Sequence, residues 1–169
     1  KLLQDKTIKP DLCLTVIESS QDILSFGLSD HVTRTPDANG MFGANGNDAW
    51  IDIPISLQTE TTRYCAVTMA CKAQTGPVQG QLYWAGEKRP GYTEDLSVVF
   101  PLIADGREHT YLIDLHEGNQ CGSINFRWRH RGSISRVRFD PPNQPGEFAI
   151  RQMSFLSEEY FCSDGFRQE

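Results

Sequence analysis

The sequence predicts an all-β fold, an antiparallel β-sandwich of the jelly-roll kind, in a single domain. Short segments alternate apolar and polar residues, which is the pattern of half-buried strands. Clusters of glycine, proline, aspartate and asparagine separate these segments, and no amphipathic helical pattern lies between them. Several short strands with this spacing are typical of sandwiches and jelly rolls.

Five segments are predicted to be strands. They cover residues 64–71, 110–115, 124–129, 135–140 and 148–156. In the first of them, Cys65, Val67, Met69 and Cys71 share one face, because every second side chain of a strand points the same way. Residues 31–48 are polar and rich in asparagine and glycine, so they are expected to form a long loop.

The size of the chain suits one domain with loose ends. Its 169 residues can bury a core. A composition with 38% hydrophobic and 22% charged residues excludes a disordered chain and a membrane protein. No apolar run reaches the length of a transmembrane helix. We expect residues 20–157 to form the domain, residues 1–19 a linker or first strand, and residues 158–169 a C-terminal tail or linker. The chain begins without methionine, which suggests a piece of a longer protein.

Net charge and cysteine usage bear on partners and compartment. A formal charge of −6 argues against nucleic acid as a partner. The five cysteines are odd in number and have neither a CxxC motif nor zinc-ligand spacing. This pattern indicates reduced thiols and a cytoplasmic location.

The chain lacks the sequence motifs of common enzyme classes. It has no G-x-S-x-G, P-loop or H-E-x-x-H motif, and its four histidines are scattered among turn-like or charged residues. Glu94 or Asp95 could form an acid/base pair with Asp140 only if the fold brings them together. No cofactor is expected. Structural calcium is the one open possibility, and its conceivable ligands are Asp48, Asp52 and Glu147.

An ordered series of short motifs in the second half of the chain carries a family resemblance. The series is Gln81-Leu-Tyr-Trp84, Asp95-Leu-Ser-Val-Val-Phe100, Asp105-Gly-Arg-Glu-His-Thr-Tyr111, Gly132-Ser-Ile-Ser-Arg-Val-Arg-Phe-Asp-Pro141 and Gly146-Glu-Phe-Ala-Ile150. It resembles the galactose-binding-like jelly rolls attached to bacterial glycosyltransferases of surface polysaccharide synthesis. Those modules have a Gly-Asn-Asp-Pro segment before an early strand, and Gly46-Asn-Asp-Ala49 matches it in part.

The resemblance covers residues 20–157 and implies a function. It implies a non-catalytic carbohydrate-binding module that recognises a bacterial polysaccharide for the catalytic domain of its parent protein. Two different functions stay open beside it, because one fold serves many functions. The first is a module that docks onto another protein or domain through an apolar patch. The second is a polysaccharide lyase that uses tyrosine, histidine and arginine.

Aromatic side chains are the first group of candidate ligand-binding residues, since they can cover the apolar face of a sugar ring. Tyr83, Trp84 and Tyr92 are the candidates. Tyr83 is expected on a polar face, and Tyr92 in a loop. Trp84 alternates with apolar neighbours, so core packing competes with binding there. Whether Trp50 points to the core or to the outside stays open, because it alternates with Asp52 rather than with an apolar residue.

Four arginines form the second group of candidates. Arg127 and Arg129 alternate on one predicted strand, and Arg136 and Arg138 alternate on the next. If the two strands pair, four guanidinium groups gather on one face, and like charges that lie opposite each other destabilise a sheet. Either an acidic ligand or buried carboxylates would offset that cost. Because the arginine fork suits carboxylates, an acidic polysaccharide is one expectation.

Overall fold

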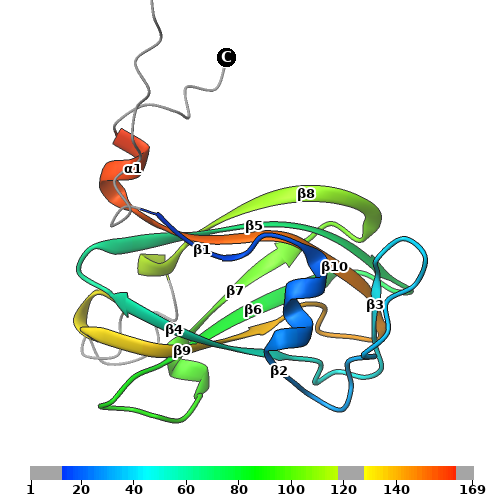
Figure 1. Ribbon diagram of the computed structural model, residues 1–169, viewed down its shortest axis with the longest axis horizontal. Coiled ribbons are helices and arrows are strands. Elements are labelled where there is room, and N and C mark those ends of the chain that lie inside the picture. The colour runs from blue at the N-terminus through cyan, green and yellow to red at the C-terminus, as the bar shows by residue number, and fades with distance from the viewer. Residues whose placement is uncertain (1–12, 118–127, 163–169) are drawn as a thin grey trace, which may run out of the picture.

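Two antiparallel five-stranded sheets pack face to face in the computed structural model, which describes residues 13–117 and 128–162 (Figure 1). The predicted antiparallel β-sandwich is therefore confirmed. Sheet A contains β1 (Cys13–Ile17), β3 (Phe42–Ala44), β5 (Thr62–Ala73), β8 (Asp105–Asp114) and β10 (Gly146–Ser157). Sheet B contains β2 (Gly27–Leu28), β4 (Ile51–Gln58), β6 (Val78–Ala85), β7 (Ser97–Leu102) and β9 (Ser133–Asp140).

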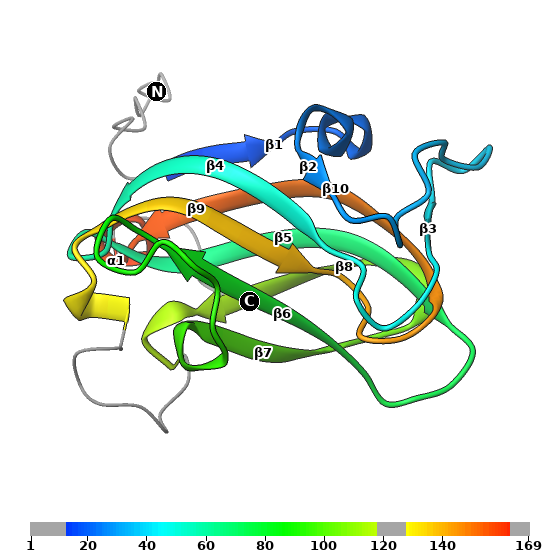
Figure 2. The same cartoon turned by 90° about the horizontal axis from the view of Figure 1, so that it is seen from below.

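Strands that are distant in sequence pair in both sheets. Sheet A has the order β1-β10-β5-β8, with β3 also paired to β10, and sheet B has the order β2-β4-β9-β6-β7. Figure 2, seen from below, shows β4, β9, β6 and β7 side by side. This order places β6 and β9 next to each other inside sheet B, so their outward side chains meet on one surface.

The described helices are short and lie at the ends of strands. They are the 3₁₀ helices η2 (Ser20–Ser25), η3 (Glu94–Leu96), η4 (Leu115–Glu117) and η6 (Trp128–His130), and the α-helix α1 (Glu158–Cys162). No helix in the part of the chain that the structure describes is long and apolar enough to cross a membrane.

The core lies between the sheets and takes its side chains from alternate strand positions. Cys65, Val67, Met69 and Cys71 all point into it from β5, as the alternation predicts. The largest buried side chains are tryptophan and phenylalanine, and Trp84 packs edge to face on Trp128 with ring centroids 5.2 Å apart. Such aromatic burial supplies much of the stabilisation of a small core.

Two predicted elements differ from the structure. The alternation predicts a strand over 124–129, but Trp128 and Arg129 lie in η6 instead, and residues 124–127 lie outside the described residues. The segment 31–48 is not loop throughout, because β3 within it pairs with β10. The physical reason is Phe42, whose buried ring stacks on Phe148 with centroids 6.1 Å apart. One apolar anchor in a polar segment is too weak a pattern to predict a strand.

The buried thiols of β5 yield the first testable prediction. Cys65 and Cys71 are free and buried; burial raises the pKa of both thiols, that of Cys71 to about 11. Alkylation of the native protein at pH 8 should therefore be at least roughly a hundredfold slower at these sites than at the half-buried Cys13, because the thiolate is the reactive form. Peptide mapping by mass spectrometry measures this. Equal labelling of all three would contradict the burial of the β5 thiols.

Candidate functional site

The outer face of sheet B carries a cleft of about 540 Å³. That volume lies in the range of small-molecule sites, which is roughly 300–1,000 Å³. The floor comes from outward side chains of the strands β6, β7 and β9, and the walls come from the segments before β4 and before η3. The lining side chains that matter below are Asp48, Gln81, Tyr83, Tyr92, Glu94, Arg138 and Asp140.

Strand alternation in β6 explains the floor of the cleft. Leu82 and Trp84 point into the core, so Gln81 and Tyr83 point outward. Gly80 lies on the core side, where a Cβ atom would sit 2.7 Å from the Phe100 ring. Glycine at this position therefore lets an aromatic ring pack directly beneath the floor.

Arg138 lines the cleft from β9. The sheet register sets Tyr83 opposite it on β6 and Asp52 opposite it on β4. Its guanidinium lies over the ring of Tyr83, 5.3 Å from the centroid, and over the ring of Trp50, 5.4 Å from the centroid. The cation thus separates the two aromatic rings, and each ring contributes a cation–π contact.

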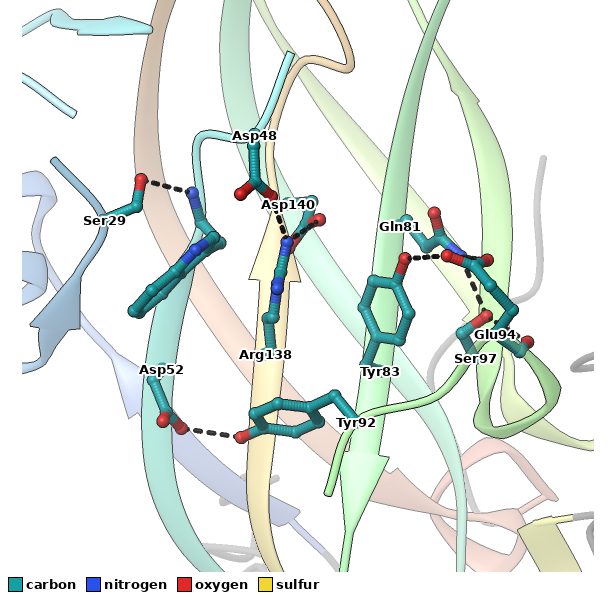
Figure 3. Close-up of polar contacts among 11 residues, drawn as sticks. Ser29, Asp48, Asp52, Gln81, Tyr83, Tyr92, Glu94, Ser97, Arg138 and Asp140 are labelled. Atoms are coloured by element: carbon teal, nitrogen blue, oxygen red, sulfur yellow. Dashed lines mark hydrogen bonds and ion pairs between the residues drawn. The ribbon is translucent and has the colours of Figure 1, made fainter. Parts of the chain in front are cut away.

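Two carboxylates hold the guanidinium of Arg138. Its Nε donates to Asp140 Oδ1 at 2.7 Å, and its Nη2 donates to Asp140 Oδ2 at 2.8 Å and to Asp48 Oδ1 at 2.6 Å (Figure 3). Burial alone would lower the pKa of Arg138, but these carboxylates raise it above its ordinary value. Burial raises the pKa of Asp140, against the opposing effect of Arg138. The two side chains are thus a mutually dependent pair.

Each tyrosine of the cleft donates its hydroxyl to a carboxylate. Tyr83 donates to Glu94 Oε1 and Tyr92 donates to Asp52 Oδ1, both at 2.6 Å, as Figure 3 shows. Burial, followed by these hydrogen bonds, raises the pKa of both tyrosines. Both hydroxyls are therefore protonated donors at neutral pH and retain only acceptor capacity for a ligand.

The loop between β6 and β7 folds back over sheet B to form one wall. Arg136 donates from Nη2 to the carbonyl oxygen of Pro90 at 2.9 Å, and its guanidinium lies 5.1 Å from the centroid of the Tyr92 ring. Its Nη1 is 3.6 Å from Asp52 Oδ2. These contacts tie the loop to β9 and β4, so the hydroxyl of Tyr92 reaches a strand two places away from β6.

The structure brings together four of the seven predicted site residues. Tyr83, Tyr92, Arg136 and Arg138 all lie on the outer face of sheet B. Three candidates differ. They are Trp84, which is 1% exposed in the core; Arg129, which lies exposed on η6; and Arg127, which is outside the described residues.

The predicted surface of four arginines on paired strands is corrected accordingly. Arg129 follows Trp128 in a 3₁₀ helix, not on a strand beside β9. The true neighbours of β9 are β4 and β6, which place an aspartate and a tyrosine beside Arg138. The repulsion that the sequence suggested is offset by carboxylates of the protein itself.

Comparisons with known proteins come from solved structures. No family model matches the chain, and no curated protein matches it in sequence. The xylan-binding module CBM15 superimposes with a TM-score of 0.54 at 15% identity, covering 87% of this chain and 97% of that one. The chain shares its jelly-roll fold.

Two further modules superimpose less closely. The C-terminal CBM6 of the laminarinase LamC from Zobellia galactanivorans gives a TM-score of 0.48 at 10% identity, covering 86% of this chain and 99% of that one. A family 11 carbohydrate-binding module from Clostridium thermocellum gives a TM-score of 0.44 at 12% identity, covering 93% of this chain and 95% of that one.

Sequence reasoning did not assign several residues in or beside the cleft to the ligand site. Trp50 and Asp52 flank the buried Ile51, so the strand period could have placed both on the outer face. Glu94 entered only as a catalytic candidate, and nothing local indicated that it accepts from Tyr83. Asp48 lies in a loop, and its bond to Arg138 spans 90 positions of the chain.

The conceivable calcium ligands do not form one site. Asp48 accepts from Arg138, Asp52 accepts from Tyr92, and Glu147 lies on β10 in the other sheet. Within residues 13–117 and 128–162, no three histidine, cysteine, aspartate or glutamate side chains come close enough to hold a metal ion.

Proposed function

We propose that the protein is a non-catalytic carbohydrate-binding module that holds a glycan segment in the cleft on sheet B. The observation that carries this proposal is the arrangement around Arg138, where aromatic rings and fixed polar groups share one groove. Aromatic rings suit the apolar faces of sugars, and planar polar groups suit their hydroxyls. The xylan-binding module of similar fold supports the proposal.

The proposed mechanism is tethering. A module that binds a polysaccharide raises the effective concentration of that polymer at a linked domain. The family resemblance of the motifs implies that this linked domain is a glycosyltransferase and that the polysaccharide is bacterial. Cytoplasmic location belongs to the same proposal, and fractionation of cells that express the full-length parent protein tests it.

Alanine substitution at Tyr92 tests the site. Its ring is half-buried and forms a wall of the cleft, so Tyr92→Ala should weaken glycan binding about tenfold, which corresponds to ~1.4 kcal/mol. Isothermal titration with the best ligand of a polysaccharide panel measures the change.

Tyr64→Ala is the matched control for this substitution. Tyr64 lies on sheet A with the Arg63 guanidinium 5.1 Å from its ring centroid, the same separation as for Arg136 and Tyr92. The control should bind like the wild type. Equal losses in the two variants would place the glycan elsewhere.

One observation favours a second candidate function, glycoside hydrolysis. Glu94 and Asp140, the acid/base pair that the sequence suggests, do line the same cleft, whereas Asp95 is paired with Arg89 at 3.6 Å. Each carboxylate is already held, Glu94 by Tyr83 and Asp140 by Arg138. We therefore expect no release of reducing ends from any bound polysaccharide. Turnover that disappears in Glu94→Gln would establish the hydrolase instead.

Polysaccharide lysis and protein docking have less support in the geometry. The polysaccharide lyase would combine tyrosine, histidine and arginine, but His109 lies on β8 of sheet A while Tyr92 lies over sheet B. A protein-docking face has an apolar centre. This cleft is instead lined by polar and charged groups, among them the ion pair of Arg138 with Asp140.

A further inference from the structure

We propose that the cleft selects uncharged, hydroxyl-rich glycan segments and rejects anionic ones, so that Arg138 positions the site rather than reading an acidic ligand. This inference rests on the proposed function and specifies its ligand class. It reverses the expectation that an arginine cluster on this sheet binds an acidic polysaccharide.

The charge of this surface disfavours an anionic ligand. The carboxylates of Asp48, Asp52 and Asp140 lie against the guanidinium groups of Arg136 and Arg138, and that of Glu94 accepts from Tyr83 beside them. Four carboxylates and two guanidinium groups leave this surface with a net charge of −2. Both arginines already face carboxylates. An incoming carboxylate or sulfate would meet an excess of like charge, which Coulomb repulsion penalises more strongly in a partly desolvated cleft than in water.

The hydrogen-bonding groups on the Gln81 side favour a ligand that can donate. Gln81 donates from Nε2 to Glu94 Oε2 at 2.8 Å and to Ser97 Oγ at 2.9 Å, so both amide hydrogens are engaged. Its Oε1 can only accept, as can the remaining lone pairs of Glu94 and the oxygen of Tyr83. A sugar hydroxyl can donate to these atoms, whereas a carboxylate or sulfate has no hydrogen to give.

The Gln79 end of β6 supplies a donor that hydroxyls also need. The backbone N–H of Gln79 donates to Asn143 Oδ1 at 3.0 Å, which orients the Asn143 amide with its NH₂ group as the remaining donor. Both residues line the cleft. Acceptors around Gln81 and an amide donor at Asn143 match groups that donate and accept at once, which is the property of a hydroxyl.

The experiment compares two panels of polymers with the intact chain. Hydroxyethylcellulose, arabinoxylan, mixed-linkage β-glucan and galactomannan form the neutral panel; carboxymethylcellulose, polygalacturonate, alginate and hyaluronan form the anionic panel. Affinity gel electrophoresis should show retardation by at least one neutral polymer and by no anionic one. The affinity for a neutral polymer should change less than about twofold between ~0.01 M and ~1 M ionic strength. Over this range the Debye length falls from about 30 Å to about 3 Å.

A charge variant sharpens the test. Asp48 is exposed and holds Arg138, so Asp48→Asn should admit weak, salt-sensitive binding of anionic polymers. Asp105→Asn carries the same charge change on sheet A, where Asp105 pairs with His109, and should bind no anionic polymer.

Two results would overturn the inference. Salt-sensitive binding of an anionic polymer by the wild type, lost in Arg138→Gln, would show that Arg138 reads an acidic ligand. Failure to bind any polymer of either panel would instead refute the proposed function itself, and the inference with it. Binding to the neutral panel and binding to the anionic panel therefore show whether the ligand class or the proposed function itself is wrong.

Discussion

Replacing Trp84 by alanine should destabilise the domain by about 3–5 kcal/mol, the usual cost of removing a large aromatic side chain from a core. Trp84 is 1% exposed and packs edge to face on Trp128, which is itself fully buried and donates from Nε1 to the carbonyl oxygen of Thr62 at 2.6 Å. The cavity would therefore lie beside a second fixed indole that cannot move to fill it. For a domain of this size the melting temperature should fall by roughly 6–20 °C.

Trp84→Phe distinguishes a core role from a binding role for this residue. The indole Nε1 of Trp84 is buried and has no hydrogen-bond partner within the described structure, so phenylalanine loses no hydrogen bond. We expect it to lower stability by less than the alanine variant and to leave glycan affinity unchanged. Differential scanning calorimetry and titration measure the two properties. If the Trp84→Phe protein folds but no longer binds glycan, Trp84 is a ligand-binding residue after all.

Removing the Arg138 guanidinium should have the second large effect. Arg138→Ala leaves the Asp140 carboxylate, 16% exposed, without its two hydrogen bonds. Leaving one member of a largely buried charged pair unpaired costs about 2–3 kcal/mol of unfolding free energy, less than for a completely dry pair. The substitution also removes the group between Trp50 and Tyr83, so glycan affinity should fall at least about tenfold.

The pH dependence of this effect has a definite sign. Burial raises the pKa of Asp140, and loss of Arg138 removes the effect that opposes the rise. A carboxyl whose folded pKa lies above its unfolded value destabilises the fold at pH above the folded pKa, and this penalty disappears below the unfolded value of about 3.9. The stability difference between wild type and Arg138→Ala should thus be full at pH 7 and should narrow as the pH falls towards about 4.

A double variant checks the assignment to Asp140. Arg138→Ala combined with Asp140→Asn removes the unpaired charge and should recover part of the lost stability at pH 7. Urea unfolding at pH 7 and near pH 4 measures all three proteins. A deficit that is independent of pH, and that the second substitution does not reduce, would attribute the loss to packing on the aromatic rings instead.

Local pattern predicted four of the ten described strands, because strand alternation follows from backbone geometry alone. The segments 64–71, 135–140 and 148–156 lie within β5, β9 and β10, whereas 110–115 covers the second half of β8 and runs one residue past its end. The strands β1, β2, β4, β6 and β7 were not among the predicted segments, and two other segments differ from what the pattern predicts. Around Trp128 a 3₁₀ helix replaces the expected strand, and in β3 a strand forms in a polar stretch because Phe42 finds Phe148 across the sheet.

The sequence by itself determined the all-β class and the outward direction of Tyr83, Arg136 and Arg138, since both depend on a period of two residues along one strand. Only the tertiary structure decided what those side chains meet. The register of β9 with β4 and β6 set Arg138 between Asp52 and Tyr83, and a loop brought Asp48 to the same guanidinium. Pairing partners are chosen by contacts between distant segments, so no local pattern reveals that the arginines are already neutralised.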